Sequence, residues 1–317
     1  MFLGIEIAKK VVNTARVIIF SLLIISCSLD DSELTDQINA DNEKIEAYLT
    51  ANNINATKDN SGIYYQELST NSTGTSVNNN DVLYILYTIQ TLDGKILEQS
   101  SDSIAVPFYH NYQSVIPLGL DYGMQLMKSG EKFRFFIPST LAYEEYSNSN
   151  FFDAYTNFIM DVELVEIKNK ASIYLEEKDK IRSFLDQKDL DDENLENDLY
   201  YSVIKEGRGK RPSPKSSVTI NFVRKYLDGT IIEQTSSSPI TFQLSNNEAV
   251  EGLERGILKM KEGGKALVIM PSRLGFDESL QVFPTKLRTH LLKDKIIFSS
   301  VEPFSPLIYE VELLQVL

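Results

Sequence analysis

The side chains that most often perform chemistry in enzymes are scarce in this chain. It has one cysteine, Cys27, and two histidines, His110 and His290, which lie far apart in the sequence. A single cysteine cannot form an intrachain disulfide, and without a Cys/His cluster no zinc site is expected. There is also no glycine-rich phosphate loop and no Ser/His/Asp signature. We therefore expect a chemistry that needs no metal, no other cofactor and no nucleophile.

The composition describes an acidic protein that is rich in aromatic residues. The 317 residues carry a formal charge of -14 and include 16 Tyr and 16 Phe but no Trp. This length fits two domains better than one. An acidic surface repels phosphate backbones, so nucleic acid is not expected as a partner. A basic or unfolded polypeptide is a compatible partner, although acidity can also serve solubility alone.

Cys27 follows a leader-like segment. Basic residues precede the apolar run 17–25, which is too short for a comfortable membrane span and has the order of a secretory signal. Residues 24–27 (Ile-Ile-Ser-Cys) resemble the bacterial lipobox, in which the cysteine is lipidated and becomes the new N-terminus. We therefore expect a lipid-anchored protein of the cell envelope, on a periplasmic or outer-membrane face. A plain membrane anchor or a chance cysteine is the alternative.

The rest of the sequence repeats at a spacing of roughly 135 residues. The paired segments are 43–49 and 179–185, 63–65 and 199–201, 92–94 and 227–229, 98–100 and 233–235, 127–130 and 260–263, and 138–139 and 271–272. Both copies end in a strand of alternating polar and apolar residues, at 158–164 and 307–313. The repeat indicates two tandem copies of one domain.

Each copy combines a short amphipathic helix with several strands. Asp-Gly pairs at 93–94 and 228–229 mark hairpin turns. Apolar residues recur at i, i+4 and i+7 in the short helix, as Leu120, Met124 and Met127 and again as Leu253, Ile257 and Met260. The pattern predicts an α+β fold of two tandem domains, each an antiparallel sheet wrapped on a short helix, with a further helix before each. The expected boundaries are a signal peptide at 1–26, a tether and helix at 27–58, a first domain at 59–168, a helical and acidic linker at 169–198, and a second domain at 199–317 with an insertion at 277–300.

The order of these motifs resembles the FKBP-type peptidyl-prolyl cis-trans isomerases. The resembling segments are Tyr87, 93–94, 115–117, 127–131, 137–143 and 161–164 in the first copy, and 248–253, 260–263, 270–272, Pro303 and 310–313 in the second. No single segment is specific, but the order occurs twice and covers residues 62–168 and 199–317. The arrangement of helix and domain behind a lipobox is also similar to lipoproteins of Bacteroidetes-type bacteria, including gliding-associated ones.

The resemblance implies an enzyme that assists the folding of exported proteins by acting on proline-containing or unfolded polypeptides. Rotation about an X-Pro bond faces a barrier of about 20 kcal/mol because amide resonance must be broken. An apolar pocket favours the twisted, less dipolar amide, while a hydroxyl or backbone N–H holds its carbonyl. Such a reaction explains why a chain without familiar catalytic groups can encode an enzyme.

The resemblance also implies the site residues. In the first copy Tyr87, Glu98 and Tyr143 would be catalytic, and the substrate-binding residues would be Leu97, Phe108, Ile116, Leu120, Phe152 and Met160. The corresponding residues of the second copy are Phe222, Ile232, Glu233, Ile240, Val250, Leu253, Phe276, Val301 and Tyr309. Each apolar residue among them would equally be ordinary core in any sheet protein.

The two copies depart from the family pattern to different extents. The family's floor tryptophan is absent from both, and Phe276 replaces the tyrosine that Tyr143 supplies in the first copy. We therefore expect isomerase activity in the first copy and only peptide binding in the second. The alternative is a non-catalytic chaperone or envelope assembly lipoprotein with degenerate domains.

The insertion at 277–300 has a composition of its own. Leu287, Leu291 and Leu292 have helix-like spacing, and several lysines make the segment basic. In the family pattern this is the loop over the pocket, so we expect the insertion beside the second copy's pocket as a lid or client-gripping arm. A surface excursion that packs only its own leucines is the alternative.

We predict that Cys27 is lipidated and that the leader is removed. Intact-mass measurement of membrane-extracted protein should show an acylated chain that begins at Cys27. A Cys27→Ala variant should lose membrane attachment, and an equally membrane-bound variant would contradict the prediction.

Overall fold

The computed structural model describes residues 31–317 except 102, 112, 191–192 and 236–237. Cys27 and the predicted signal peptide lie outside these residues. The described chain forms two compact units. The first unit contains residues 31–170 together with Leu280–Ile297, and the second contains Ala171–Ser279 and Phe298–Leu317.

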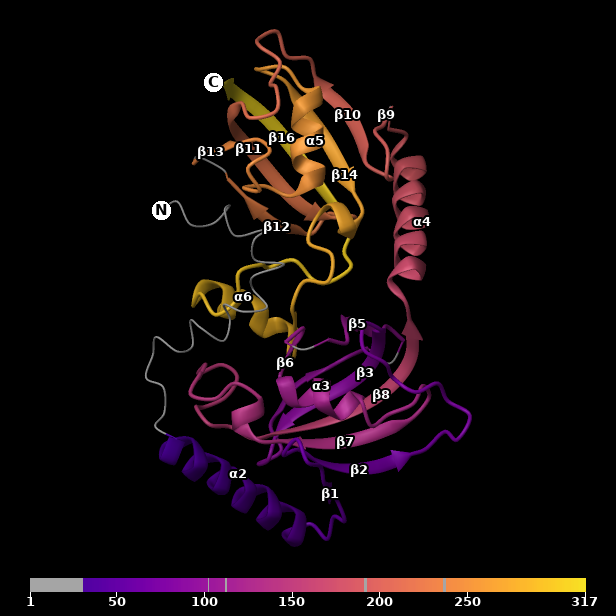
Figure 1. The fold of residues 1–317 in the computed structure, drawn as a ribbon, viewed down its shortest axis with the longest axis vertical. Coiled ribbons are helices and arrows are strands. Elements are labelled where there is room, and N and C mark those ends of the chain that lie inside the picture. Colours follow the sequence, from indigo (N-terminus) through magenta and orange to yellow (C-terminus); the bar gives the residue numbers. More distant parts are fainter. Residues whose placement is uncertain (1–30, 102, 112, 191–192, 236–237) are drawn as a thin grey trace. The chain divides into compact units, whose positions relative to one another are not determined.

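The first unit is a sheet that carries one short helix and one long helix (Figure 1). Its elements up to residue 170 are α2 (Asp31–Ala51), β1 (Thr57–Lys58), β2 (Tyr64–Ser69), β3 (Val82–Thr91), β4 (Ile96–Gln99), β5 (Val106–Tyr109), β6 (Val115–Ile116), α3 (Leu118–Met124), β7 (Lys132–Ile137), the 3-10 helix η2 (Ser139–Leu141) and β8 (Phe158–Lys168). The strands follow the order β1-β2-β7-β8-β3-β4, with β5 also paired to β3, and these pairings are antiparallel.

Alternation along the strands gives this sheet two covered faces. Phe135 and Met160 point into the main core, which also contains residues of α3. Their chain neighbours Phe136 and Ile159 point to the opposite face, because successive side chains of a strand alternate. There they pack against α2. The helix before the sheet therefore belongs to the domain instead of serving as a spacer.

The second unit repeats this plan. Its elements are α4 (Lys170–Lys188), β9 (Glu193–Asn194), β10 (Tyr200–Lys205), β11 (Ser217–Tyr226), β12 (Ile231–Gln234), β13 (Ile240–Gln243), α5 (Glu251–Lys259), β14 (Lys265–Met270), η3 (Ser272–Leu274) and β16 (Leu307–Val316). The strand order β12-β11-β16-β14-β10-β9, with β13 on β11, matches the first sheet strand for strand. Ile181 and Leu185 of α4 pack on its outer face. The predicted pair of α+β domains is confirmed.

In both units the short helix lies very close to a central strand at a glycine. A Cβ atom on Gly123 of α3 would lie 2.7 Å from the Phe135 ring of β7. One on Gly256 of α5 would lie 2.4 Å from a methyl group of Val268 on β14. Any side chain at these positions would push the helix away from the sheet, because close-packed interiors hold no spare volume.

A buried carboxylate fixes the turn that follows β7 and β14. Asp41 of α2 is fully buried and accepts a hydrogen bond from the Ser139 hydroxyl at 2.7 Å. Glu177 of α4 accepts hydrogen bonds from both the backbone N–H of Ser272, at 2.7 Å, and its hydroxyl, at 2.6 Å. Burial raises the pKa of Glu177, and the hydrogen bonds from Ser272 act in the opposite direction.

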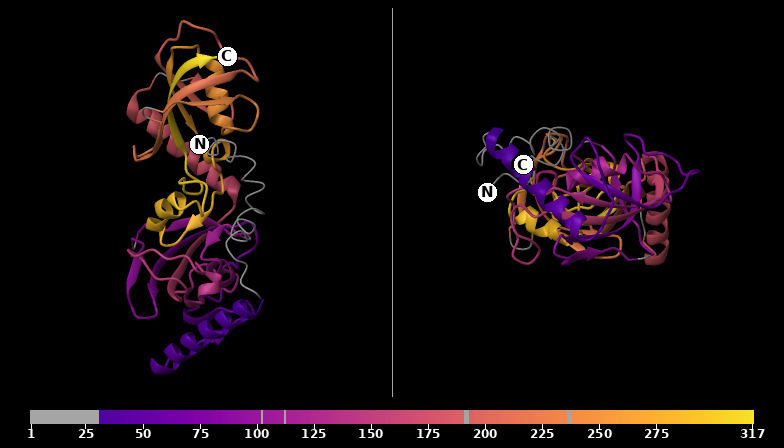
Figure 2. Two further views of the ribbon diagram at one scale, coloured as in Figure 1. Left: turned by 90° about the vertical axis from the view of Figure 1, so that its left-hand side faces the viewer. Right: turned by 90° about the horizontal axis from the view of Figure 1, so that it is seen from below.

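Residues 280–297 belong to the first unit although the second copy encodes them. They form β15 (Gln281–Val282), the 3-10 helix η4 (Thr285–Leu287) and α6 (Arg288–Lys293). Strand β15 pairs in parallel with β6, and the buried side chains of Leu287, Leu291 and Ile297 join the core of the first unit. Figure 2 shows this yellow segment against the magenta elements of that unit. The segment was expected to be part of the second copy, and it packs instead in the core of the first unit.

We predict that Glu177→Ala lowers the free energy of unfolding of the second unit by about 2–4 kcal/mol, because two buried donors of Ser272 lose their acceptor. Chemical denaturation followed by circular dichroism measures the change. Asp179→Ala, at an exposed position of the same helix, is the matched control and should change stability little. Equal effects of the two substitutions would contradict the role of the buried carboxylate.

Candidate functional site

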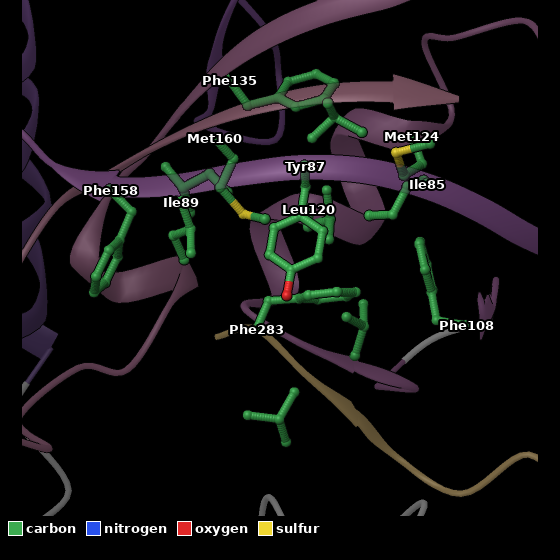
Figure 3. Close-up of a cluster of buried hydrophobic side chains, with 14 of the residues drawn as sticks. Ile85, Tyr87, Ile89, Phe108, Leu120, Met124, Phe135, Phe158, Met160 and Phe283 are labelled. Atoms are coloured by element: carbon green, nitrogen blue, oxygen red, sulfur yellow. The ribbon is translucent and has the colours of Figure 1, made fainter. Parts of the chain in front are cut away.

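The structure gathers the predicted residues of the first copy into one buried apolar cluster, at the position expected for the pocket and called here the first pocket. Tyr87, Phe108, Leu120, Tyr143, Phe152 and Met160 are buried in a single cluster, and Leu97 and Ile116 pack against it. Figure 3 shows the Tyr87 ring extending from β3, with Leu120 close by and Met160 and Phe108 on either side. Strands β3, β5 and β8 supply the walls and α3 supplies the floor.

Tyr143 enters the pocket from the loop after η2. Its ring lies 4.8 Å from that of Phe152 and 5.8 Å from that of Phe158, measured between centroids. Burial raises the pKa of the Tyr143 phenol well above its ordinary value. The phenol therefore stays neutral at ordinary pH and keeps a proton that it can donate in a hydrogen bond.

Glu98 is the polar group at the edge of the pocket. The Tyr87 hydroxyl donates to a Glu98 oxygen at 2.7 Å. Burial, and then the negative charge of Glu98, raise the pKa of Tyr87. Glu98 also accepts hydrogen bonds from the backbone N–H and, at 2.8 Å, from the hydroxyl of Thr285. The carboxylate thus connects the pocket wall to the 280–297 segment.

The first pocket contains Phe283 of that segment, the residue directly before Pro284. The Phe283 ring packs edge-on against Tyr87, with 4.6 Å between centroids, and lies 6.1 Å from Phe108. The Tyr143 hydroxyl donates to the backbone carbonyl of Phe283 at 2.7 Å. This carbonyl belongs to the peptide bond that precedes Pro284. Figure 3 shows Phe283 beside the hydroxyl end of Tyr87.

The predicted residues of the second copy also come together, in what is called here the second pocket. Phe222, Val250, Leu253, Phe276, Val301 and Tyr309 are buried in one cluster, against which Ile232 and Ile240 pack. The rings of Phe222 and Tyr309 lie 5.6 Å apart. The structure thus groups the same positions in both copies, while the roles assigned to them remain predictions.

Arg224 is the residue of the second pocket that the sequence analysis missed. Its guanidinium lies 4.7 Å above the Phe276 ring. It donates to the Tyr309 hydroxyl at 3.1 Å and to Glu233 at 2.5 Å. Only 8% of Arg224 is exposed, so a cation lies where the first copy has apolar side chains. The alternation of strand β11 could have predicted this position, because Arg224 lies two residues after the inward-facing Phe222 and therefore on the same face of the strand.

The sequence analysis also missed Phe283 and Thr285 as parts of the first pocket. Nothing in their local pattern indicates a contact with Tyr143 or Glu98, which lie 140 and 187 positions earlier in the chain. Within the described ranges, no group of three or more His, Cys, Asp or Glu side chains is arranged to hold a metal ion.

Each unit is thus an antiparallel sheet wrapped on a short helix, with a buried cluster of aromatic and aliphatic side chains between them. The sequence model of the family described as FKBP-type peptidyl-prolyl cis-trans isomerase matches residues 74–165 and 209–314. The chain belongs to this family, and the two matches correspond to the two repeats.

Similar proteins come from bacteria and plants. The chain is 34% identical over 82 residues to a probable FKBP-type peptidyl-prolyl cis-trans isomerase FkpA of Neisseria meningitidis, covering 25% of this chain and 29% of that protein. It is 35% identical over 134 residues to FkpA of Aeromonas hydrophila, covering 41% and 48%. It is 32% identical over 120 residues to the chloroplastic isomerase FKBP16-3 of Arabidopsis thaliana, covering 37% and 48%. The chain thus spans less than half the length of these curated relatives.

Solved structures with similarity include the three FKBP domains of wheat FKBP73. That comparison has a TM-score of 0.32 and 20% identity, and it covers 83% of this chain and 99% of the wheat chain. FkpA from Escherichia coli gives a TM-score of 0.36 with 22% identity and covers 46% of this chain and 60% of its own.

We predict that Arg224→Leu destabilises the second unit by about 1–3 kcal/mol, because the buried Tyr309 hydroxyl loses a hydrogen-bond partner. Tyr309→Phe in the same chain should recover part of this loss, so a double-mutant cycle by urea unfolding should give a coupling energy of about 1 kcal/mol. Arg208→Leu, at an exposed position, is the control. Additive effects of the two substitutions would show that Arg224 and Tyr309 do not interact.

Proposed function

We propose that the chain is a peptidyl-prolyl cis-trans isomerase whose activity resides in the first pocket. The observation that carries the proposal is the hydrogen bond from Tyr143 to the carbonyl of Phe283, the residue directly before Pro284. A neutral, buried phenol is held where the carbonyl of an X-Pro bond lies. Clients would be proline-containing or unfolded polypeptides.

The geometry supports a mechanism that uses the environment instead of a reactive group. The aromatic walls exclude water, so the pocket offers little solvation to the dipole of a planar amide. Twisting the C–N bond reduces that dipole, and the apolar surroundings therefore stabilise the twisted form relative to the planar one. Tyr143 holds the carbonyl while the prolyl side rotates, and each 1.4 kcal/mol of preference for the twisted form raises the rate tenfold.

The second unit supports a different role. Arg224 brings a positive charge and its hydrogen bonds into the second pocket, and Phe276 has no hydroxyl to donate. A guanidinium beside the amide also offers it polar stabilisation, which weakens the preference for the twisted form. We propose that the second unit is non-catalytic and acts in peptide binding or in assembly at the envelope.

We further propose that the protein works in the cell envelope and is tethered to a membrane by lipid on Cys27. The lipobox-like residues 24–27 support this location. The net charge of -14 supports the absence of a nucleic-acid partner. Among the described residues, none of the helices has the length and apolarity that crossing a membrane requires.

The proposed function predicts different effects of removing the two buried hydroxyls. Tyr143→Phe should lower kcat for isomerisation of a proline tetrapeptide by about fivefold, because a hydrogen bond worth about 1 kcal/mol is lost. Tyr309→Phe is the matched control in the second pocket and should leave kcat unchanged.

Since Tyr143 also holds Phe283, rates should be followed over a range of peptide concentrations, which separates kcat from KM. Equal effects of the two substitutions would refute the assignment to the first pocket. No catalysis by the wild-type chain would favour the chaperone alternative.

A further inference from the structure

The 280–297 segment contacts the first unit as a bound peptide would. Its backbone adds to β6, because the Gln281 N–H donates to the Ser114 carbonyl at 2.9 Å and the Phe283 N–H donates to the Ile116 carbonyl at 2.8 Å. The addition of an extended strand to an existing one is a general mode of peptide recognition. The Gln281 side chain adds a hydrogen bond from its Nε2 to the Pro107 carbonyl at 3.1 Å.

The side chains of Phe283 and Thr285 make specific contacts with residues of the first pocket. Phe283 is fully buried against Tyr87. Thr285, the residue directly after Pro284, places both its N–H and its hydroxyl on Glu98. Because a carboxylate accepts hydrogen bonds and cannot donate them, Glu98 selects a hydroxyl over an apolar side chain of the same shape.

The segment is also tied to the first unit outside the pocket. Leu287 and Leu291 are fully buried in its core. The Tyr146 hydroxyl donates to Asp294 at 2.9 Å. The chain continues into the second unit at both ends of the segment, so binding is intramolecular and a client must compete with a high effective concentration.

We propose that residues 281–285 are an internal ligand of the first pocket, which excludes clients while bound. We also infer that Glu98 makes the pocket prefer clients with a hydroxyl residue directly after proline. The blocking role stands on the contacts alone, whereas the client preference rests on the proposed function. While the segment occupies the pocket, clients cannot bind. The apparent affinity for clients therefore equals the intrinsic affinity multiplied by the fraction of molecules whose pocket is free.

The direct test is binding of the ligand sequence in trans. The probe is a synthetic peptide of residues 279–288, titrated by calorimetry into the wild-type chain and into a full-length variant in which a Gly/Ser linker replaces 280–297. The peptide should bind the variant about tenfold or more tightly than the wild type. Peptides that carry Phe283→Ala or Thr285→Val should each bind the variant about tenfold more weakly.

Point substitutions keep the test decisive if the deletion variant does not fold. The double substitution Phe283→Ala and Thr285→Ala in the full chain removes the two side chains that contact Tyr87 and Glu98, and it retains the buried leucines. This variant should also bind the peptide more tightly than the wild type does. Lys286→Ala, at an exposed position of the same segment, should behave as wild type. Equal peptide binding by wild type and by a folded variant, or no binding by that variant, overturns the proposal.

Isomerase assays on the same proteins separate this proposal from the proposed function. The variants with a vacated pocket should isomerise a proline tetrapeptide several-fold faster than wild type at low peptide concentration. If the peptide binds as expected but no protein isomerises, the internal ligand stands and the isomerase assignment fails. If all proteins isomerise equally and bind the peptide equally, the isomerase assignment stands and the internal ligand fails.

Discussion

The close contact between the short helix and the central strand determines the rest of each unit. Gly123 and Gly256 let α3 and α5 approach side chains of β7 and β14 to distances at which a Cβ atom would clash. Leu120, the floor of the first pocket, is on α3 and is fully buried. The approach of the helix therefore sets where Leu120 lies among the inward residues of the strands. A larger residue at Gly123 would move the floor before it changed any wall.

The buried carboxylates extend this constraint to the opposite side of the sheet. Asp41 and Glu177 lie on the outer helices, yet their partners Ser139 and Ser272 begin the turns that lead to the pockets. Tyr143 follows Ser139 by only a few residues. The outer helix thus helps to direct the aromatic residue that follows the turn, Tyr143 or Phe276, into its cluster. The Pro-Ser pairs that recur in the sequence mark these turns, although they do not reveal the acidic partners.

The two pockets satisfy the same structural requirement in different ways. A buried tyrosine hydroxyl needs a partner, because an unpaired one costs free energy. In the first pocket, Tyr143 donates to a peptide carbonyl. In the second, Tyr309 receives a hydrogen bond from Arg224, whose charge is balanced by Glu233. In the first unit the partner is a backbone carbonyl of the 280–297 segment, and in the second it is a side chain of strand β11. The duplication preserved the fold and allowed the pockets to diverge.

The resemblance to the family placed Tyr87, Leu120 and Tyr143 at one site. The sequence alone determined the repeat and the α+β class of both copies. These features follow from local periodicity and from the order of short motifs, which the backbone converts directly into strands, turns and a helix face. The inward position of Arg224 could also have been predicted from the sequence, since strand alternation places it there. The occupant of the first pocket, Phe283, could not be predicted from the sequence. Phe283 meets Tyr143 across 140 residues of chain, and its own neighbours in sequence encode only a short apolar segment. Which pocket such a segment fills depends on the shape and polarity of surfaces that exist only after the first unit has folded.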